Sequence, residues 1–112
     1  MDLTYLKQLM PDDPETMRDF LSVCLGECLE MMKNLERAYS DQDYLEVGRM
    51  AHTIKSSARN CDYQPLADAS LAVELAVQEE RIQDLPSAID AMKPAHEAFV
   101  RELTQLLEQD HF

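Results

Sequence analysis

A short basic stretch in an acidic chain contains the side chains best suited to chemistry. Residues 49–60 read RMAHTIKSSARN and place His52 among Arg49, Lys55 and Arg59, with no Asp or Glu. A histidine with an unperturbed pKa near ~6.5 offers a neutral, nucleophilic nitrogen at neutral pH. The surrounding cations would stabilise an anion held on or near that ring. The stretch therefore predicts a histidine that carries or binds an anionic group.

Hydrolytic and nucleotide-binding sites are not supported by the remaining residues. His52 has no companion Ser or Cys nucleophile with an acidic third member, and His96 and His111 lie far along the chain. We expect His96 to be structural, at the edge of an inward helix face. Gly26 and Gly48 are isolated within helical patterns, so no Gly-rich phosphate loop is present. We therefore expect a non-enzymatic protein, and any phosphate on His52 must come from another protein.

The three cysteines give no evidence of a metal site. No C-x-x-C pair occurs, and Cys24 and Cys28 lie one helical turn apart on an apolar stripe. Reduced core cysteines are the simplest interpretation. We expect neither a bound metal nor a cofactor of the chain's own.

Length and charge narrow the class of protein. The 112 residues suit one domain spanning 1–112, which we expect to be a monomer. A net charge of −12 argues against nucleic-acid binding, which needs clustered Lys and Arg. No apolar run approaches the ~20 residues that span a bilayer, and the start has no signal-peptide pattern. We expect a cytoplasmic protein without membrane association, and Met1 with the polar tail favours a free-standing one.

The hydrophobic pattern of the first forty residues predicts two helices. A short one follows Asp2 and ends at residues 10–14, and a long one opens with Asp13 as cap and Pro14 as its first residue. The long helix ends near Tyr39 and Ser40. The predicted inward positions are Leu3, Leu6, Leu9, Met17, Leu21, Cys24, Cys28, Met31, Leu35 and Ala38.

Three further helices follow at short intervals. One begins after Asp41 and reaches Cys61, another begins at Pro65, and a long one follows the break at residues 81–86. Pro94 lies inside the last pattern, where we expect a kink or a short interruption. The inward positions are Tyr44, Val47, Ala51, Ile54, Ala58, Cys61, Leu66, Ala69, Val73, Ala76, Ile89, Met92, Phe99, Leu103 and Leu106. The fold class is all-α: an antiparallel up-down-up-down four-helix bundle with a short additional N-terminal helix.

On its helix, His52 faces solvent. At 100° per residue it lies more than 90° from the centre of the stripe formed by Val47, Ala51, Ile54 and Ala58. The same side of the helix carries Leu45, Gly48, Arg49, Lys55, Ser56 and Arg59. Because the residues one turn before and after His52 are small, another molecule could approach the imidazole closely.

These residues resemble a known family. "AHTIKSSARN" is similar to the signature of the histidine-containing phosphotransfer (HPt) domain: Ala-His, two residues, Lys, then a small residue and Ser. The resemblance extends over nearly the whole chain, including "LERAYSDQDYLEVGRMAH" and "LADASLAVELAVQEE". Such domains are four-helix bundles that act as intermediates in multistep His–Asp phosphorelays.

The resemblance implies a role for each site residue. His52 would accept a phosphoryl group, on Nε2 of the ring, from a receiver-domain aspartyl phosphate and pass it to a second receiver. Lys55 and Ser56 would stabilise the phosphoryl group. Receiver domains of response regulators or of a hybrid sensor histidine kinase would be the partners, and the Mg²⁺ would belong to the receiver. The residues that would contact the partner are Leu45, Gly48, Arg49 and Arg59.

The sequence departs from the family at two positions and leaves one alternative open. Ser56 stands where the family most often has glycine, and we expect it to tune the site and not to abolish it. Asp62 stands where a second glycine often ends the helix. The alternative function is a binding module that docks on a histidine kinase or response regulator and regulates it without being phosphorylated.

Overall fold

A computed structural model describes residues 1–10 and 13–109, and every regular element in those ranges is helical. Pro11 and Asp12, in the break predicted after the first helix, lie outside the described residues, as does the tail at 110–112 with His111. The elements are α1 (Thr4–Leu9), α2 (Pro14–Ser40), α3 (Tyr44–Asn60), α4 (Gln64–Gln78), a 3₁₀ turn η1 (Ile82–Asp84) and α5 (Leu85–Gln109). The prediction of an all-α bundle is confirmed.

Acidic caps start the two helices that lead to the site. Asp13 accepts a hydrogen bond from the backbone N–H of Glu15, and Pro14 follows as the first helical residue of α2. Asp43 caps α3 by accepting from the backbone N–H of Glu46 at 3.3 Å. The predicted start of α3 after Asp41 is therefore about two residues early.

The helices α2, α3 and α4 are each followed by a turn in which one residue adopts the left-handed conformation. The residues that adopt it are Gln42, Asp62 and Glu80, with φ of 59°, 52° and 57°. At the end of α3 the backbone N–H of Tyr63 donates to the carbonyl of Ala58 at 2.8 Å, and that of Asp62 to Arg59 at 3.0 Å. This is the Schellman pattern, which usually places glycine in the left-handed position. Asp62 therefore keeps the turn that a glycine would make, although a side chain is disfavoured there.

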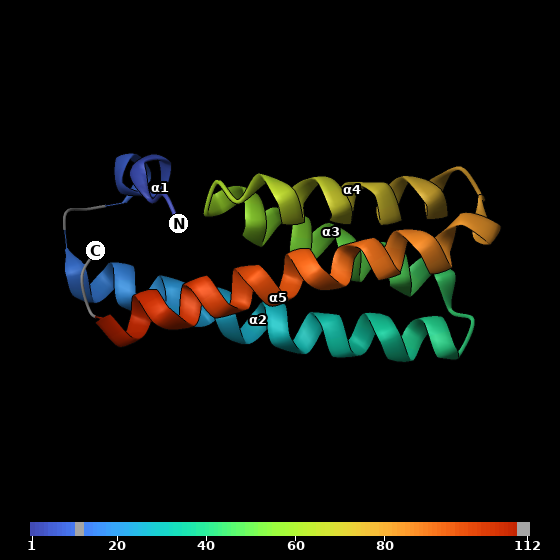
Figure 1. Cartoon of the computed structure of the whole chain (residues 1–112), viewed down its shortest axis with the longest axis horizontal. Helices are drawn as coiled ribbons and strands as arrows, with labels where there is room; N and C mark the ends of the chain where they lie inside the picture. Colours follow the sequence, from blue (N-terminus) through green and yellow to red (C-terminus); the bar gives the residue numbers. More distant parts are fainter. Residues whose placement is uncertain (11–12, 110–112) are drawn as a thin grey trace.

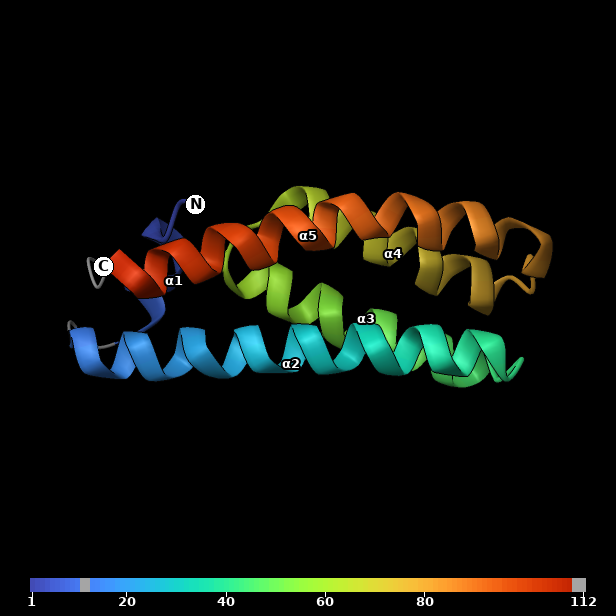
Figure 2. The ribbon, with the colours of Figure 1, turned by 60° about the horizontal axis from the view of Figure 1, so that its bottom comes forward.

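The four long helices pack around one core in the order of the chain. Contacts join α2 to α3, α3 to α4, α4 to α5 and α5 back to α2. Figure 1 shows each of these helices running opposite to the one before it, along a body that measures 44 by 21 by 19 Å. In both views α1 lies at the end of the bundle where α2 begins and α5 finishes (Figures 1 and 2). The α-amino group of Met1, 3.3 Å from a carboxylate oxygen of Glu102 on α5, ties the N-terminal segment to that end.

The core matches most of the predicted inward positions, although Tyr44, Ala69 and Leu106 are only partly buried and two positions on α1 and α2 need correction. Leu3 and Leu6 are buried, but Leu9 is 61% exposed because α1 is too short to continue its inward face. On α2 Met32 is buried and Met31 is only partly so. A step of four residues from Cys28 thus replaces the predicted step of three.

Pro94 does not interrupt α5. The helix runs without a break from Leu85 to Gln109, so the predicted short interruption is wrong. Pro94 itself is exposed, and the carbonyl that loses its helical partner can be hydrated on that side. The fifth helix also begins within the predicted break at 81–86, because η1 leads directly into it.

Candidate functional site

The middle of α3 presents His52 to solvent, as the periodicity predicts. Its side chain is 59% exposed, whereas Ala51, Ile54 and Ala58 on the opposite face are fully buried. These apolar contacts fix the rotation of α3 about its axis. The position of the histidine therefore follows from the burial of the other face.

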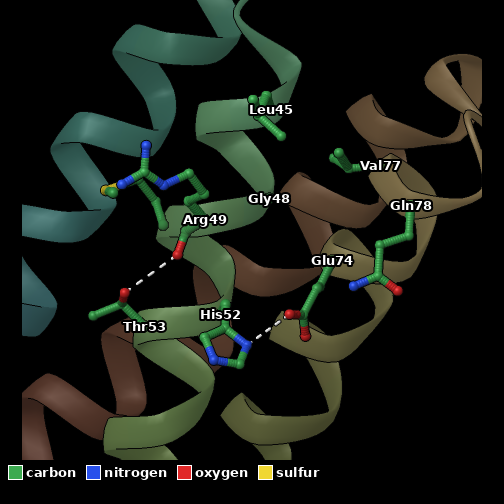
Figure 3. Close-up of a pocket in the computed structure, with 9 residues that line it drawn as sticks. Leu45, Gly48, Arg49, His52, Thr53, Glu74, Val77 and Gln78 are labelled. Carbon is green, nitrogen blue, oxygen red and sulfur yellow. Dashed lines mark hydrogen bonds and ion pairs between the residues drawn. The ribbon is translucent and has the colours of Figure 1, made fainter.

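A carboxylate on α4 contacts both His52 and Lys55. Glu74 Oε2 lies 2.7 Å from His52 Nδ1, and Glu74 Oε1 lies 2.5 Å from Lys55 Nζ. Figure 3 shows Glu74 and His52 pointing toward each other across the space between α3 and α4. Glu74 was not among the predicted site residues. An acidic residue at the edge of the apolar stripe of α4, beside buried Val73, was the signal that could have indicated it.

Glu74 is held in its ionised form. Burial acts to raise its pKa, but the hydrogen bonds from Lys55 and His52 and the charges of both groups lower it below the ordinary value of 4.5. A carboxylate accepts hydrogen bonds and cannot donate them, so the ring nitrogen facing it carries a proton. In the neutral imidazole, Nε2 then keeps the free lone pair.

Lys55 is not on the solvent-facing flank, where helical periodicity placed it. The residue is only 8% exposed, and its ammonium group is turned toward α4. The long, flexible side chain reaches Glu74 because burying it unpaired would be costly. Lys55 is therefore already paired with a carboxylate.

The two small neighbours of His52 have different surroundings. Ser56 is exposed, and its hydroxyl donates a hydrogen bond to the backbone carbonyl of His52 at 3.1 Å. Gly48 is buried against α4, where an added Cβ would lie 3.1 Å from Cγ1 of Val77. Gly48 therefore contributes to close packing of α3 on α4 as well as to an open surface beside the imidazole.

A cavity of about 350 Å³ adjoins the imidazole between α3 and α4 (Figure 3). Its lining residues are Leu45, Gly48, Arg49, Met50, His52, Thr53, Glu74, Val77 and Gln78. Leu45, at its rim, is 73% exposed. The structure thus brings Leu45 and Gly48 to the same hollow as His52.

The two arginines predicted to contact a partner, Arg49 and Arg59, are both exposed but differ in their ion pairs. Arg49 lies 3.3 Å from the carboxylate of Glu46 on its own helix, and Figure 3 shows its side chain directed away from His52. Arg59 lies two turns beyond His52 on the same side of α3 and makes no ion pair with any described residue. The charge of Arg49 is therefore partly balanced by Glu46, whereas that of Arg59 is not.

The cysteines and His96 of the described residues have structural surroundings and form no metal-binding group. Cys24, Cys28 and Cys61 are free thiols and all are buried. Within residues 1–10 and 13–109 no three His, Cys, Asp or Glu side chains are grouped to hold a metal ion. His96 is buried and bonds through Nε2 to the backbone carbonyl of Cys28 at 2.9 Å, which is a structural contact. No described helix is long and apolar enough to cross a membrane.

The structure is thus an all-helical bundle in which an exposed histidine in the middle of α3 is hydrogen-bonded to a carboxylate on α4. The Hpt domain family matches residues 19–110, which is most of the chain. The chain belongs to this family, whose members are phosphocarriers in histidine phosphorelays and interact with receiver domains and kinases of two-component systems. Neither the curated proteins nor the solved structures contain a match to this sequence.

Proposed function

We propose that this protein is a phosphorelay intermediate, in which His52 accepts a phosphoryl group from the aspartyl phosphate of a receiver domain and passes it to another receiver. The observation that carries the proposal is the pairing of Nδ1 with Glu74, 2.7 Å away on a 59% exposed imidazole. It leaves Nε2 as the free nucleophile of a ring that a second protein can reach.

The transfer needs no proton movement at Nε2. The Nε2 lone pair of neutral His52 attacks phosphorus, the N–P bond forms, and the P–O bond to the receiver aspartate breaks and leaves a carboxylate. The Nδ1 proton stays on the ring, where Glu74 balances the positive charge that develops. We assign Lys55 and Ser56 to stabilise the phosphoryl oxygens, which requires each to reorient from its present hydrogen bond. The Mg²⁺ is supplied by the receiver, and this chain provides no cofactor.

We assign the docking of the receiver to the surface around the cavity. Leu45 and Gly48 would contact apolar side chains of the partner, while Arg49 and Arg59 would face its acidic pocket. The proposal treats residues 1–112 as one domain that acts as a monomer. It takes the up-down-up-down bundle with a short N-terminal helix as its architecture, which the order of helix contacts supports.

The direct test is transfer of labelled phosphate from a receiver. The chain is incubated with a ³²P-phosphorylated receiver and Mg²⁺, and we expect acid-labile, base-stable label on the wild type and none on His52→Gln. The chain has three histidines, so His111→Gln serves as the matched control that keeps its label. Equal labelling of His52→Gln would overturn the assignment.

The same experiment separates the alternative function. A wild-type chain that binds phosphorylated receivers or a histidine kinase but stays unlabelled with several of them would be a regulatory binding module. In that case the loss of binding in Leu45→Asp would still locate the docking surface, because a charge on this exposed leucine disfavours apolar contact.

A further inference from the structure

The cavity between α3 and α4 has apolar side chains on both of its walls. Leu45 on α3 faces Val77 on α4, next to Gln78, and Gly48 places no side chain between them (Figure 3). The volume of the cavity is about 350 Å³, whereas an apolar cavity of about 150 Å³ already holds a benzene molecule. It is therefore large enough for one large apolar side chain.

The charged groups beside this cavity are already paired. Glu74 is bound to both His52 and Lys55. Arg49 lies 3.3 Å from the carboxylate of Glu46 on its own helix. Among the described residues that line the cavity, none thus offers an unpaired charge to an ionic group, and burying such a group there would be costly. The cavity therefore favours an apolar occupant.

The nucleophilic nitrogen of His52 faces away from this cavity. Nδ1 is bound to Glu74 at 2.7 Å, and Figure 3 shows the other ring nitrogen, Nε2, directed away from Leu45 and Val77. A receiver that brings its aspartate to Nε2 therefore has its phosphorylation pocket on one side of the ring and the cavity on the other. A phosphoryl group on Nε2 does not fill the cavity.

Resting on the proposed function, we propose that this cavity anchors one large apolar side chain of the receiver, on the side of the imidazole away from the phosphoryl group. Leu45 lies seven residues before His52, which is about 10 Å along α3. The anchoring residue of the receiver is therefore expected about 10 Å from its phosphorylated aspartate. Because buried apolar anchors carry much of the affinity of an interface, Val77 and Gln78 on α4 contribute to the choice of receiver.

Titration calorimetry with a receiver that binds the chain measures the anchoring contact. Leu45→Ala removes part of one cavity wall, and we expect affinity to fall on the order of tenfold, with folding checked by circular dichroism. The factor should be the same at low and high salt, because an apolar contact is not screened. Leu9→Ala, the same change on an exposed leucine of α1, is the matched control and leaves affinity unchanged. An unchanged affinity in Leu45→Ala, or a loss that disappears at high salt, would overturn the inference.

Photo-cross-linking tests on which side of the imidazole the apolar side chain of the receiver lies. Gln78→p-benzoylphenylalanine, at the exposed edge of the cavity, should cross-link to an apolar segment of the receiver outside its phosphorylation pocket. Arg59→p-benzoylphenylalanine, two turns beyond His52, is the matched variant and should cross-link to a different segment. Mass spectrometry identifies both segments. Cross-linking from position 78 to the loop that carries the aspartate, or from position 59 alone, contradicts the inference.

Chemical loading separates failure of this inference from failure of the proposed function. The chain is phosphorylated with phosphoramidate and titrated with a receiver whose phosphoryl-accepting aspartate is replaced by alanine. Leu45→Ala should lower affinity by the same factor with and without the phosphoryl group, because Nε2 faces away from the cavity. A factor that vanishes on loading places the phosphoryl group in the cavity and overturns the inference, even where receivers label His52. Receivers that bind through the cavity but never label the wild type overturn the proposed function alone.

Discussion

At the scale of single residues, the pair formed by Glu74 and Lys55 makes folding stability depend on pH. The pKa of Glu74 is lowered in the folded state, so its contribution is present above the ordinary value of 4.5 and is lost as pH falls through the lowered value. Glu74→Gln should lower the free energy of unfolding by about 1–2 kcal/mol at about pH 7, because Lys55 is left buried without its anion. The deficit should shrink as pH is lowered toward about 3.

Urea unfolding followed by circular dichroism at several pH values measures this deficit. Glu30→Gln, which removes an exposed charge, should change the free energy of unfolding little at any pH. A deficit in Glu74→Gln that grows on acidification would show that the carboxylate does not stabilise the fold as an anion.

His52 and Lys55 differ in how far the sequence could place them. The exposure of His52 follows from the helical period, because its own helix buries the opposite face. The same period predicted an exposed Lys55. Its burial depends on Glu74, which is 19 residues away on another helix. Helical periodicity describes the direction of the Cα–Cβ bond and not the end of a long side chain.

At the scale of elements, the packing of α3 on α4 depends on the missing side chain of Gly48. We predict that Gly26→Ala, on the exposed face of α2 with nothing within 4 Å of the new Cβ, raises the free energy of unfolding by about 0.5–1 kcal/mol. Gly48→Ala should give no such gain, because its Cβ would lie 3.1 Å from Val77 Cγ1 and the loss of packing offsets the helix propensity.

Thermal and urea unfolding of the two variants provide the measurement, with Gly26→Ala as the matched control for propensity alone. A third variant, Gly48→Ala/Val77→Ala, should recover the gain relative to Val77→Ala because the contact is removed. Equal stabilisation by Gly26→Ala and Gly48→Ala would contradict this, because it would show that the α3–α4 interface accommodates a Cβ at residue 48 without loss of packing.

The start of α2 was predicted well from the residues that cap and begin helices. Asp13 with Pro14 marks the start of α2 because both act locally. The outcome at Pro94 was different, since α5 continues through it. A proline removes one hydrogen bond from any helix, but the apolar face that α5 packs on α2 and α4 holds the helix together on both sides.

At the scale of the whole molecule, the three thiols report on global opening. Cys24, Cys28 and Cys61 are at most 4% exposed, and burial, followed by the neighbouring Cys24, raises the pKa of the Cys28 thiol to about 12. Because a thiol reagent needs access to the sulfur atom and all three are buried, we predict that no cysteine of the native protein reacts rapidly at about pH 8. All three should react in denaturant.

Reaction with a chromogenic disulfide reagent at increasing urea concentrations measures this protection. The rate should rise in parallel with unfolding followed by circular dichroism, since the cysteines become accessible when the α2–α3 packing opens. One equivalent reacting at once in the absence of urea would show that a part of this core opens independently.

The sequence by itself determined the all-helical bundle, most of the residues that face its core, and the exposure of His52. All of these follow from local rules: apolar spacing, caps and breaks act within one or two turns of a helix. Only the tertiary structure decided that Glu74 meets His52, that Lys55 is buried beside it, and that Gly48 contacts Val77. Those contacts join helices that are separate in the sequence, and they depend on the rotation and register of α4 against α3, which packing of the whole core fixes.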